Sequence, residues 1–293
     1  MQKTIKEKAL FKTVITSEHK LFDLHLKETF QYRDLIFLFV KRDFNALYKQ
    51  TILGPLWAII QPLLMTVVFT VIFGNLARLT TMDVPGNYRI PGFLFYMISN
   101  ICWTYFSETL KSTSNTFLAN RSIMGKVYYP RLVSPISMSF SKLISFGIQL
   151  ILFFGFWTFY LIRGDTDIQI TLALFFLPVL VLQMIILSVG FGIIISAATT
   201  KYRDLAMLVA FGLQLWHYAC PVAYGVQLVS DEWLPLYMLN PMTPILTTFR
   251  YAVFGYGYFN LMYYLISWGI SLLVFFIGLI MFSRIERTFM DTI

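Results

Sequence analysis

The chain has 293 residues, of which 57% are hydrophobic and only 13% charged, and its formal net charge is +8. Soluble domains have roughly 45–50% apolar and about 25% charged residues, so this composition excludes an ordinary soluble protein. The basic residues lie in short segments between apolar runs, which is typical of membrane topology and not of nucleic-acid binding, so no nucleic-acid partner is expected.

The N-terminal segment is polar. Residues 1–34 are rich in Lys and Glu and lack the apolar core of a cleavable signal peptide, so we expect the N-terminus in the cytoplasm. The pattern over 32–50 then predicts an amphipathic helix suited to lying in the membrane interface, the alternative being a surface helix of a cytoplasmic domain. Its candidate functional residues are Arg42, Tyr48 and Lys49.

Six apolar runs follow, and most of them reach the ~20 residues that a membrane-spanning helix needs. Lys and Arg are concentrated between these runs on one side, whereas the segments on the other side hold four arginines, so the positive-inside rule places both termini in the cytoplasm. The sequence predicts an all-α integral membrane protein of the inner membrane, with a cytoplasmic arm and interface helix (1–52) and a six-helix transmembrane domain (53–293). The predicted spans are 53–74, 91–116, 134–161, 170–197, 205–224 and 261–282.

The inner half of the second span is unusually polar. Glu108 and Lys111 are three residues apart and therefore share a helix face. A charge at the bilayer centre costs ~2.5–3.5 kcal/mol on insertion scales, so both side chains should face protein or water. They are candidates either for a substrate path or for a structural ion pair at a dimer seam.

Two connecting segments stand out. The basic and aromatic loop 119–131 is expected on the inner side. The outer segment 226–259 remains apolar and aromatic, and prolines at 235, 241 and 244 break it. This pattern predicts two short helices that dip into the outer rim of the membrane.

Motifs for catalysis are scarce. The only Gly-Lys pair, Gly125–Lys126, lacks the context of a P-loop, so ATP hydrolysis is expected in a separate subunit and the chain is not predicted to be an enzyme by itself. Asp165 and Asp167 have the spacing of a metal pair but are interpreted as turn residues. Cys102 and Cys220 lie within predicted spans and are expected to be buried, so no metal or cofactor is predicted.

Three parts of the chain resemble the permease subunits of polysaccharide-exporting ABC transporters, the O-antigen and teichoic-acid exporter family. The first is KRDFNALYKQTILGPLWAIIQPLLMTVVFTVIFG, at 41–74. The second is ANRSIMGKVYYPRLVSP, at 119–135. The third comprises LQLWHYACPVAY at 213–224 and LNPMTPILTTFRYAVFG at 239–255.

The resemblance implies a homodimer that pairs with two copies of a cytoplasmic ATPase and moves an undecaprenyl-diphosphate-linked glycan through the membrane lipids. It also implies that loop 119–131 couples to the ATPase, although an ordinary positive-inside loop would look similar. The coupling candidates are Arg121, Lys126, Tyr128, Tyr129 and Arg131. Segment 226–259 resembles the outer gate of the family, with the candidates Tyr237, Phe249, Arg250 and Tyr251.

The substrate path is expected to combine aromatic rings, which stack on the apolar faces of sugars, with polar partners for hydroxyl groups. Any of these aromatic residues could instead face lipid or another helix. The path candidates are Trp57, Phe69, Trp103, Tyr105, Phe106, Glu108, Lys111 and Trp216.

Other functions remain open at this stage. An ABC permease for a small drug or lipid would share this architecture. A membrane enzyme acting on lipid-linked sugars would act without an ATPase, and a membrane scaffold would carry no export at all.

Overall fold

The computed structural model describes residues 26–49, 51–77, 89–116, 119–120, 123, 126, 129–199 and 204–289. These residues form helices, turns and short connections without a strand, so the predicted all-α fold class is confirmed. In chain order the helices are α1 (Leu26–Gln31), α2 (Arg33–Tyr48), η1 (Gly54–Leu56), α3 (Trp57–Phe69), η2 (Thr70–Leu76), α4 (Gly92–Ser114), α6 (Val133–Arg163), η4 (Leu172–Phe176), α7 (Leu177–Thr199), α8 (Leu205–Tyr218), η5 (Val226–Leu228), α9 (Leu234–Met238), α10 (Met242–Phe254) and α11 (Leu261–Phe289).

Four helical stretches in the described part of the chain are long and apolar enough to cross a membrane. They are Gly54–Leu76, Val133–Arg163, Leu172–Thr199 and Leu261–Ser283. These stretches correspond to the first, third, fourth and sixth predicted spans. The chain is therefore a multi-pass membrane protein, and the total of six crossings stays a prediction.

Helix α4 corresponds to the second predicted span and lies at the centre of the bundle. Its 23 residues would extend about 34 Å, which is enough to cross a bilayer. It is less apolar than the other spans because it contacts α3, α6, α7, α8 and α10 instead of lipid. A central position explains how polar side chains are tolerated along one of its faces.

Helix α8 is shorter than the sequence predicts. It ends at Tyr218, whereas the predicted fifth span continues to residue 224. Pro221 disfavours helical backbone at the residue before it, and Asn240 Nδ2 donates a hydrogen bond to the carbonyl of Ala219 at 3.2 Å. The predicted outer end of this span is therefore wrong, and the fourteen residues of α8 extend only about 21 Å.

Helix α7 makes the closest helix contacts of the bundle. A Cβ at Gly190 would lie 2.8 Å from Phe275 Cα in α11, and a Cβ at Gly192 would lie 2.5 Å from Thr113 Cβ in α4. Small residues let membrane helices approach closely enough for extensive van der Waals contact. Gln183 adds a buried hydrogen bond from Nε2 to Ser267 Oγ at 2.9 Å.

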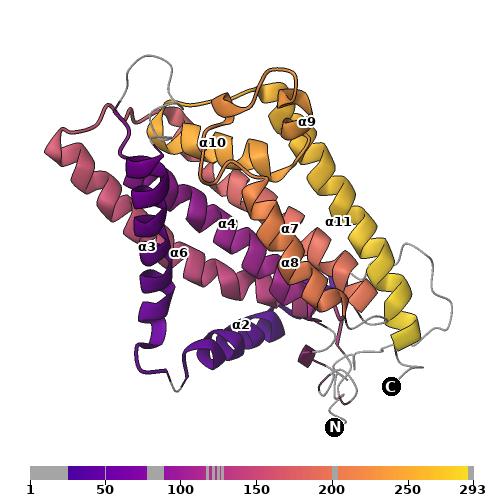
Figure 1. The fold of residues 1–293 in the computed structure, drawn as a ribbon. Coiled ribbons are helices and arrows are strands. Elements are labelled where there is room, and N and C mark those ends of the chain that lie inside the picture. Colours follow the sequence, from indigo (N-terminus) through magenta and orange to yellow (C-terminus); the bar gives the residue numbers. More distant parts are fainter. Residues whose placement is uncertain are drawn as a thin grey trace, which may run out of the picture.

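The two ends of the bundle differ (Figure 1). Helix α2 lies across one end, where α11 also terminates, and α9 and α10 lie at the opposite end. Gly255, with φ of 76°, ends α10 in the left-handed region, and the Phe254 carbonyl accepts the backbone N–H of Gln169 at 3.0 Å. The charge pattern predicts that the α2 end faces the cytoplasm, because the described basic residues of α2 and of loop 119–131 lie there.

Candidate functional site

An open cavity of about 550 Å³ lies between α3, α4, α6 and α8, next to the C-terminal end of α2. It is lined by Leu47, Tyr48, Trp57, Ala58, Gln61, Pro62, Met65, Asn100, Trp103, Thr104, Tyr105, Ser107, Glu108, Lys111, Lys142, Ser145, Phe146, Gln149, Ala210, Leu213, Gln214 and His217. The lining mixes aromatic, amide, hydroxyl and charged groups, so this cavity is the candidate substrate site.

One face of α4 supplies the polar wall of the cavity. Six of its lining residues recur at intervals of three and four, the spacing that places side chains on a single helix face. We call this face the α4 stripe; it consists of Asn100, Trp103, Thr104, Ser107, Glu108 and Lys111.

The charged groups of the stripe do not pair with each other. Lys142 of α6 donates a hydrogen bond from Nζ to Glu108 Oε2 at 3.1 Å, so the ion pair joins two helices. Lys111 is exposed and lines the same cavity, and it has no ion-pair partner among the residues that the structure describes. The sequence alone did not indicate Lys142, because its partner lies 34 positions away in the chain.

Five of the eight predicted path residues line the cavity, namely Trp57, Trp103, Tyr105, Glu108 and Lys111. The other three lie in the aromatic packing behind it. Phe69 and Phe106 are buried, and Trp216 packs against Phe106 with ring centroids 5.2 Å apart. The indole N–H of Trp216 donates to Asn240 Oδ1 at 3.0 Å, which fixes that ring.

His217 and Asn100 are lining residues that the sequence reading missed. His217 lies beside Trp103 with ring centroids 5.2 Å apart, and it extends the aromatic wall. Asn100 is 5% exposed, and its amide nitrogen has no acceptor among the described residues. The three- and four-residue spacing of the α4 stripe could have indicated Asn100 as a lining residue. His217 could not be identified in this way, because it reaches the cavity only through the packing of α8. The described part of the chain holds no group of three or more His, Cys, Asp or Glu side chains placed to bind a metal.

A second assembly joins α2 to the segment that precedes α6. The rings of Phe39 and Tyr129 meet edge to face at 5.6 Å, and Arg42 Nη2 donates to Asn120 Oδ1 at 3.2 Å. Arg42 also lies over the Phe39 ring at 4.4 Å. We call these four residues the α2 joint. Phe39 and Tyr129 belong to a buried apolar cluster that includes residues of α6, α7 and α11.

The predicted coupling residues have different environments. Lys126 is exposed, whereas Tyr129 and Arg131 are buried, at 4% and 9% exposure. Burial raises the pKa of the Tyr129 phenol, so its neutral hydroxyl shares a hydrogen bond with Ser134 Oγ at 3.1 Å. Arg121 and Tyr128 lie outside the described residues.

The interface-helix candidates lie along α2. Arg42 belongs to the α2 joint, and Tyr48 lines the cavity and shares a hydrogen bond with Ser145 Oγ of α6 at 3.1 Å. Lys49 is exposed at the C-cap of α2. Helix α2 therefore connects the region of loop 119–131 at one point with the cavity at another.

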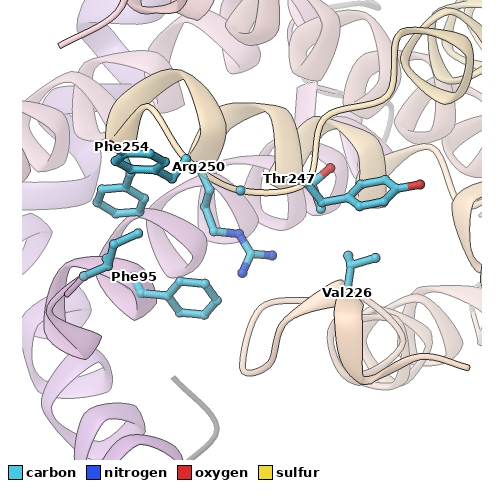
Figure 2. A pocket seen from close by; sticks show the side chains of 9 residues that line it. Phe95, Val226, Thr247, Arg250 and Phe254 are labelled. Atoms are coloured by element: carbon cyan, nitrogen blue, oxygen red, sulfur yellow. The ribbon is translucent and has the colours of Figure 1, made fainter. Parts of the chain in front are cut away.

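The outer-gate candidates tie the outer segment together. Figure 2 shows Arg250 reaching from α10 between Phe95 and the segment at Val226, beside a pocket of only about 20 Å³. Its guanidinium lies 4.3 Å from the Phe95 ring centroid and donates from Nη2 to the carbonyl of Pro221 at 2.6 Å. Phe249 is buried in the same helix.

The remaining two outer-gate candidates, Tyr237 and Tyr251, make contacts with other aromatic residues. Tyr237 and Tyr224 share a hydrogen bond between their hydroxyls at 2.9 Å. Tyr251 stacks on Phe259 with ring centroids 5.3 Å apart. The outer segment is thus an ordered structure joined to the residues that follow α8.

The sequence profile of the ABC-2 type transporter family matches residues 34–254, which extend from α2 to the end of α10. The chain belongs to the ABC-2 type transporter family. As an ABC-2 permease it is the membrane component of a transporter, and a partner subunit supplies the ATPase. This result confirms the resemblance to ABC permeases seen in the sequence.

Individual relatives are similar over most of their length. The chain is 24% identical over 259 residues to the O-antigen export system permease protein RfbA of Klebsiella pneumoniae, covering 88% of this chain and 94% of that protein. It is 28% identical over 238 residues to the O-antigen export system permease protein RfbA of Myxococcus xanthus, covering 78% of this chain and 83% of that protein.

Proposed function

We propose that this ABC-2 permease is the transmembrane subunit of an ATP-driven exporter that moves a lipid-linked polysaccharide, such as O-antigen, across the cytoplasmic membrane. The observation that carries the proposal is the match to permeases named for O-antigen export, which extends over 94% of the Klebsiella protein. The cavity supports it, because its aromatic rings and hydrogen-bonding groups suit a sugar chain. In this proposal the chain is not an enzyme by itself.

The proposed assembly is a homodimer with two ATPase subunits that carries an undecaprenyl-diphosphate-linked glycan. The cavity is open, and the helices that flank it, α3 and α8, present apolar side chains on their outer surfaces. Leu64 of α3 is 60% exposed and Phe211 of α8 is 59% exposed. A second copy facing this side would close the cavity into a path between two chains.

Coupling is proposed to run through the α2 joint. Movement of the ATPase against loop 119–131 would pass to α2 through the Phe39–Tyr129 and Arg42–Asn120 contacts. Because α2 also reaches the cavity through Tyr48, it can act as a lever on the cavity wall. Tyr129 and Arg131 then act by holding the loop in place, and the exposed Lys126 is available to the ATPase.

The outer segment is proposed to be the gate of the path. Arg250 links α10 to the carbonyl of Pro221, so a shift of α8 would be passed to α10. In the same way, the Tyr224–Tyr237 hydrogen bond would transmit a shift of α8 to α9.

Loss of the chain in its host tests the function. Lipid-linked polysaccharide is expected to accumulate inside the cell and to disappear from the surface, and the intact chain should restore export only with a catalytically competent ATPase. Normal surface polysaccharide in the deletion strain would contradict the proposal. Turnover of a lipid-linked sugar by the purified chain alone would instead identify a membrane enzyme.

The coupling role has its own test. The double variant Tyr128→Ala with Arg131→Ala, compared at equal membrane abundance, is expected to leave ATP hydrolysis running while export falls. Normal export by this double variant would contradict a coupling role for loop 119–131, but it would not contradict the proposed transport function.

A further inference from the structure

The charged groups of the cavity lie at the end of the bundle where α2 lies. Lys111 is in the last turn of α4, and Lys142 lies nine residues, or about 14 Å, from the start of α6. The predicted topology puts this end at the inner leaflet, the depth at which the headgroup of a lipid arriving from the cytoplasm would lie.

The charges of the lining do not cancel. Two lysines and a single glutamate face the cavity, and Glu108 is already paired with Lys142. Lys111 is left without an ion-pair partner among the described residues, in a cavity whose other walls are largely apolar or neutral. Ionisable residues of membrane-spanning helices that face a cavity mark ligand or ion pathways by default.

A second observation lies on the same helix face. Asn100 precedes Lys111 by eleven residues, so the two side chains are about 16 Å apart along α4. Asn100 is 5% exposed, its amide nitrogen has no acceptor among the described residues, and it lines the cavity. Buried donors are nearly always satisfied, so this amide indicates a missing acceptor such as a hydroxyl group of a ligand.

We propose that the α4 stripe binds an anionic lipid whose headgroup carries phosphate, with the phosphate at Lys111 and Lys142 and the uncharged part of the headgroup along Trp103 and Asn100. The proposal rests on the proposed function, from which it takes a lipid-linked substrate, and it names the group of that substrate which this chain recognises. As phosphate oxygens approach, they replace Glu108 as the partner of Lys142, so Glu108 competes with the ligand.

The position of Lys111 near the end of a helix would by itself be explained by the helix dipole, which favours cations there. That explanation does not account for the Asn100 amide nitrogen, which has no acceptor in the described part of the chain. It also does not account for an ion pair between α4 and α6 that faces the same cavity.

Binding to the complex of the full chain with its ATPase, in nanodiscs of phosphatidylcholine, tests the proposal. The probes are a long-chain polyprenyl diphosphate, phosphatidylglycerol and inorganic diphosphate. Lys111→Gln is expected to weaken binding of the polyprenyl diphosphate about tenfold, because a charge-assisted contact is lost. Lys111→Arg should restore most of the affinity, and Lys41→Gln, which removes an exposed lysine of α2 away from the cavity, should leave it unchanged.

Glu108→Gln provides a test of opposite sign. Removal of the competing carboxylate is expected to tighten binding about threefold, whereas a purely structural ion pair would give weaker or unchanged binding. Equal melting temperatures of the variants and the parent show that folding is retained.

The probes separate the sources of the phosphate. Preference for the polyprenyl diphosphate supports a carrier lipid, and equal, Lys111-dependent binding of phosphatidylglycerol supports a membrane phospholipid at the same site. Binding of inorganic diphosphate alone, or affinity for the lipid that is unchanged in Lys111→Gln, overturns the proposal. If lipid binding depends on Lys111 but export is normal in the strain that lacks the chain, the proposed function is wrong and the lipid site still stands.

Discussion

Two groups of helices in this permease are packed very differently. In the scaffold, formed by α4, α7 and α11, glycines bring backbones into direct contact, as at Gly190 and Phe275. In the walls, formed by α3 and α8, apolar side chains are largely exposed and no atom lies near the missing Cβ of Gly212. Both walls border the cavity, whereas the scaffold meets it only through the α4 stripe, so the parts that can shift lie beside the proposed substrate and one rigid face remains fixed.

The largest expected effect comes from overpacking the scaffold. Gly190→Leu would place a side chain against the backbone of α11, where a Cβ already lies 2.8 Å from Phe275 Cα, and should destabilise the protein by about 3 kcal/mol or more. Thermal unfolding in detergent and membrane abundance measure this loss. The control is Gly212→Leu in α8, which meets open space and is expected to change stability by less than about 0.5 kcal/mol. Equal losses in the two variants would show that the scaffold and the walls are packed alike.

A second effect concerns the attachment of α2 to the scaffold. Phe39→Ala removes a ring that is 4% exposed and contacts Tyr129, so it should destabilise the docking of α2 by about 3 kcal/mol. Export is expected to fall while ATP hydrolysis continues, and both rates are measured in proteoliposomes. Phe37→Ala, whose ring is 72% exposed on the same helix, serves as the control and should retain export. If both variants export normally, the α2 joint carries no coupling.

A smaller effect is expected where the outer segment meets the end of the α8 wall. Arg250→Met removes the hydrogen bond to the Pro221 carbonyl and the contact with Phe95, at a cost of about 2 kcal/mol. The melting temperature reports this change. Arg163→Met breaks an exposed ion pair with Asp165 and should cost less than about 0.5 kcal/mol. A loss at Arg163 as large as that at Arg250 would contradict a structural role for the buried guanidinium.

The smallest effect tests how the α3 wall is held. Gln149→Leu deletes the hydrogen bond from Nε2 to the Ala58 carbonyl, 3.1 Å away, and should cost about 0.6 kcal/mol, a typical value for a hydrogen bond between membrane helices. Faster hydrogen exchange is expected at the start of α3, with α7 unchanged. Thr158→Val, which removes a hydroxyl that donates to the Phe154 carbonyl within α6, should leave the exchange of α3 as it is. Unchanged exchange in both variants would mean that other contacts hold this wall.

Much of the architecture could be predicted from hydropathy and charge. The predicted spans 53–74, 134–161, 170–197 and 261–282 correspond to helices because long apolar runs have few alternatives in a bilayer. The outer end of α8 could not be placed from Pro221 alone, because membrane helices tolerate proline. The end also depends on Asn240, which lies about twenty residues later and takes part in the turn after Tyr218. The breaks at prolines did indicate short helices in the outer segment, where α9 and α10 lie.

The candidate site, too, could be predicted from the sequence only in part. Glu108 and Lys111 were predicted because charge in a membrane helix is conspicuous in a sequence. Lys142 was not predicted as their neighbour, because pairing between α4 and α6 depends on how two separate helices cross. The aromatic candidates were too numerous for composition to separate Trp103, which lines the cavity, from Phe106, which is buried behind it.

The sequence by itself determined that this chain is helical and embedded in a membrane, since a hydrocarbon solvent requires backbone hydrogen bonds within each span and leaves charge in the loops. Only the tertiary structure decided which faces meet. It turned the α4 stripe towards a cavity, paired Glu108 with Lys142 and placed α2 on Tyr129, because these contacts depend on helix crossings that no local pattern encodes.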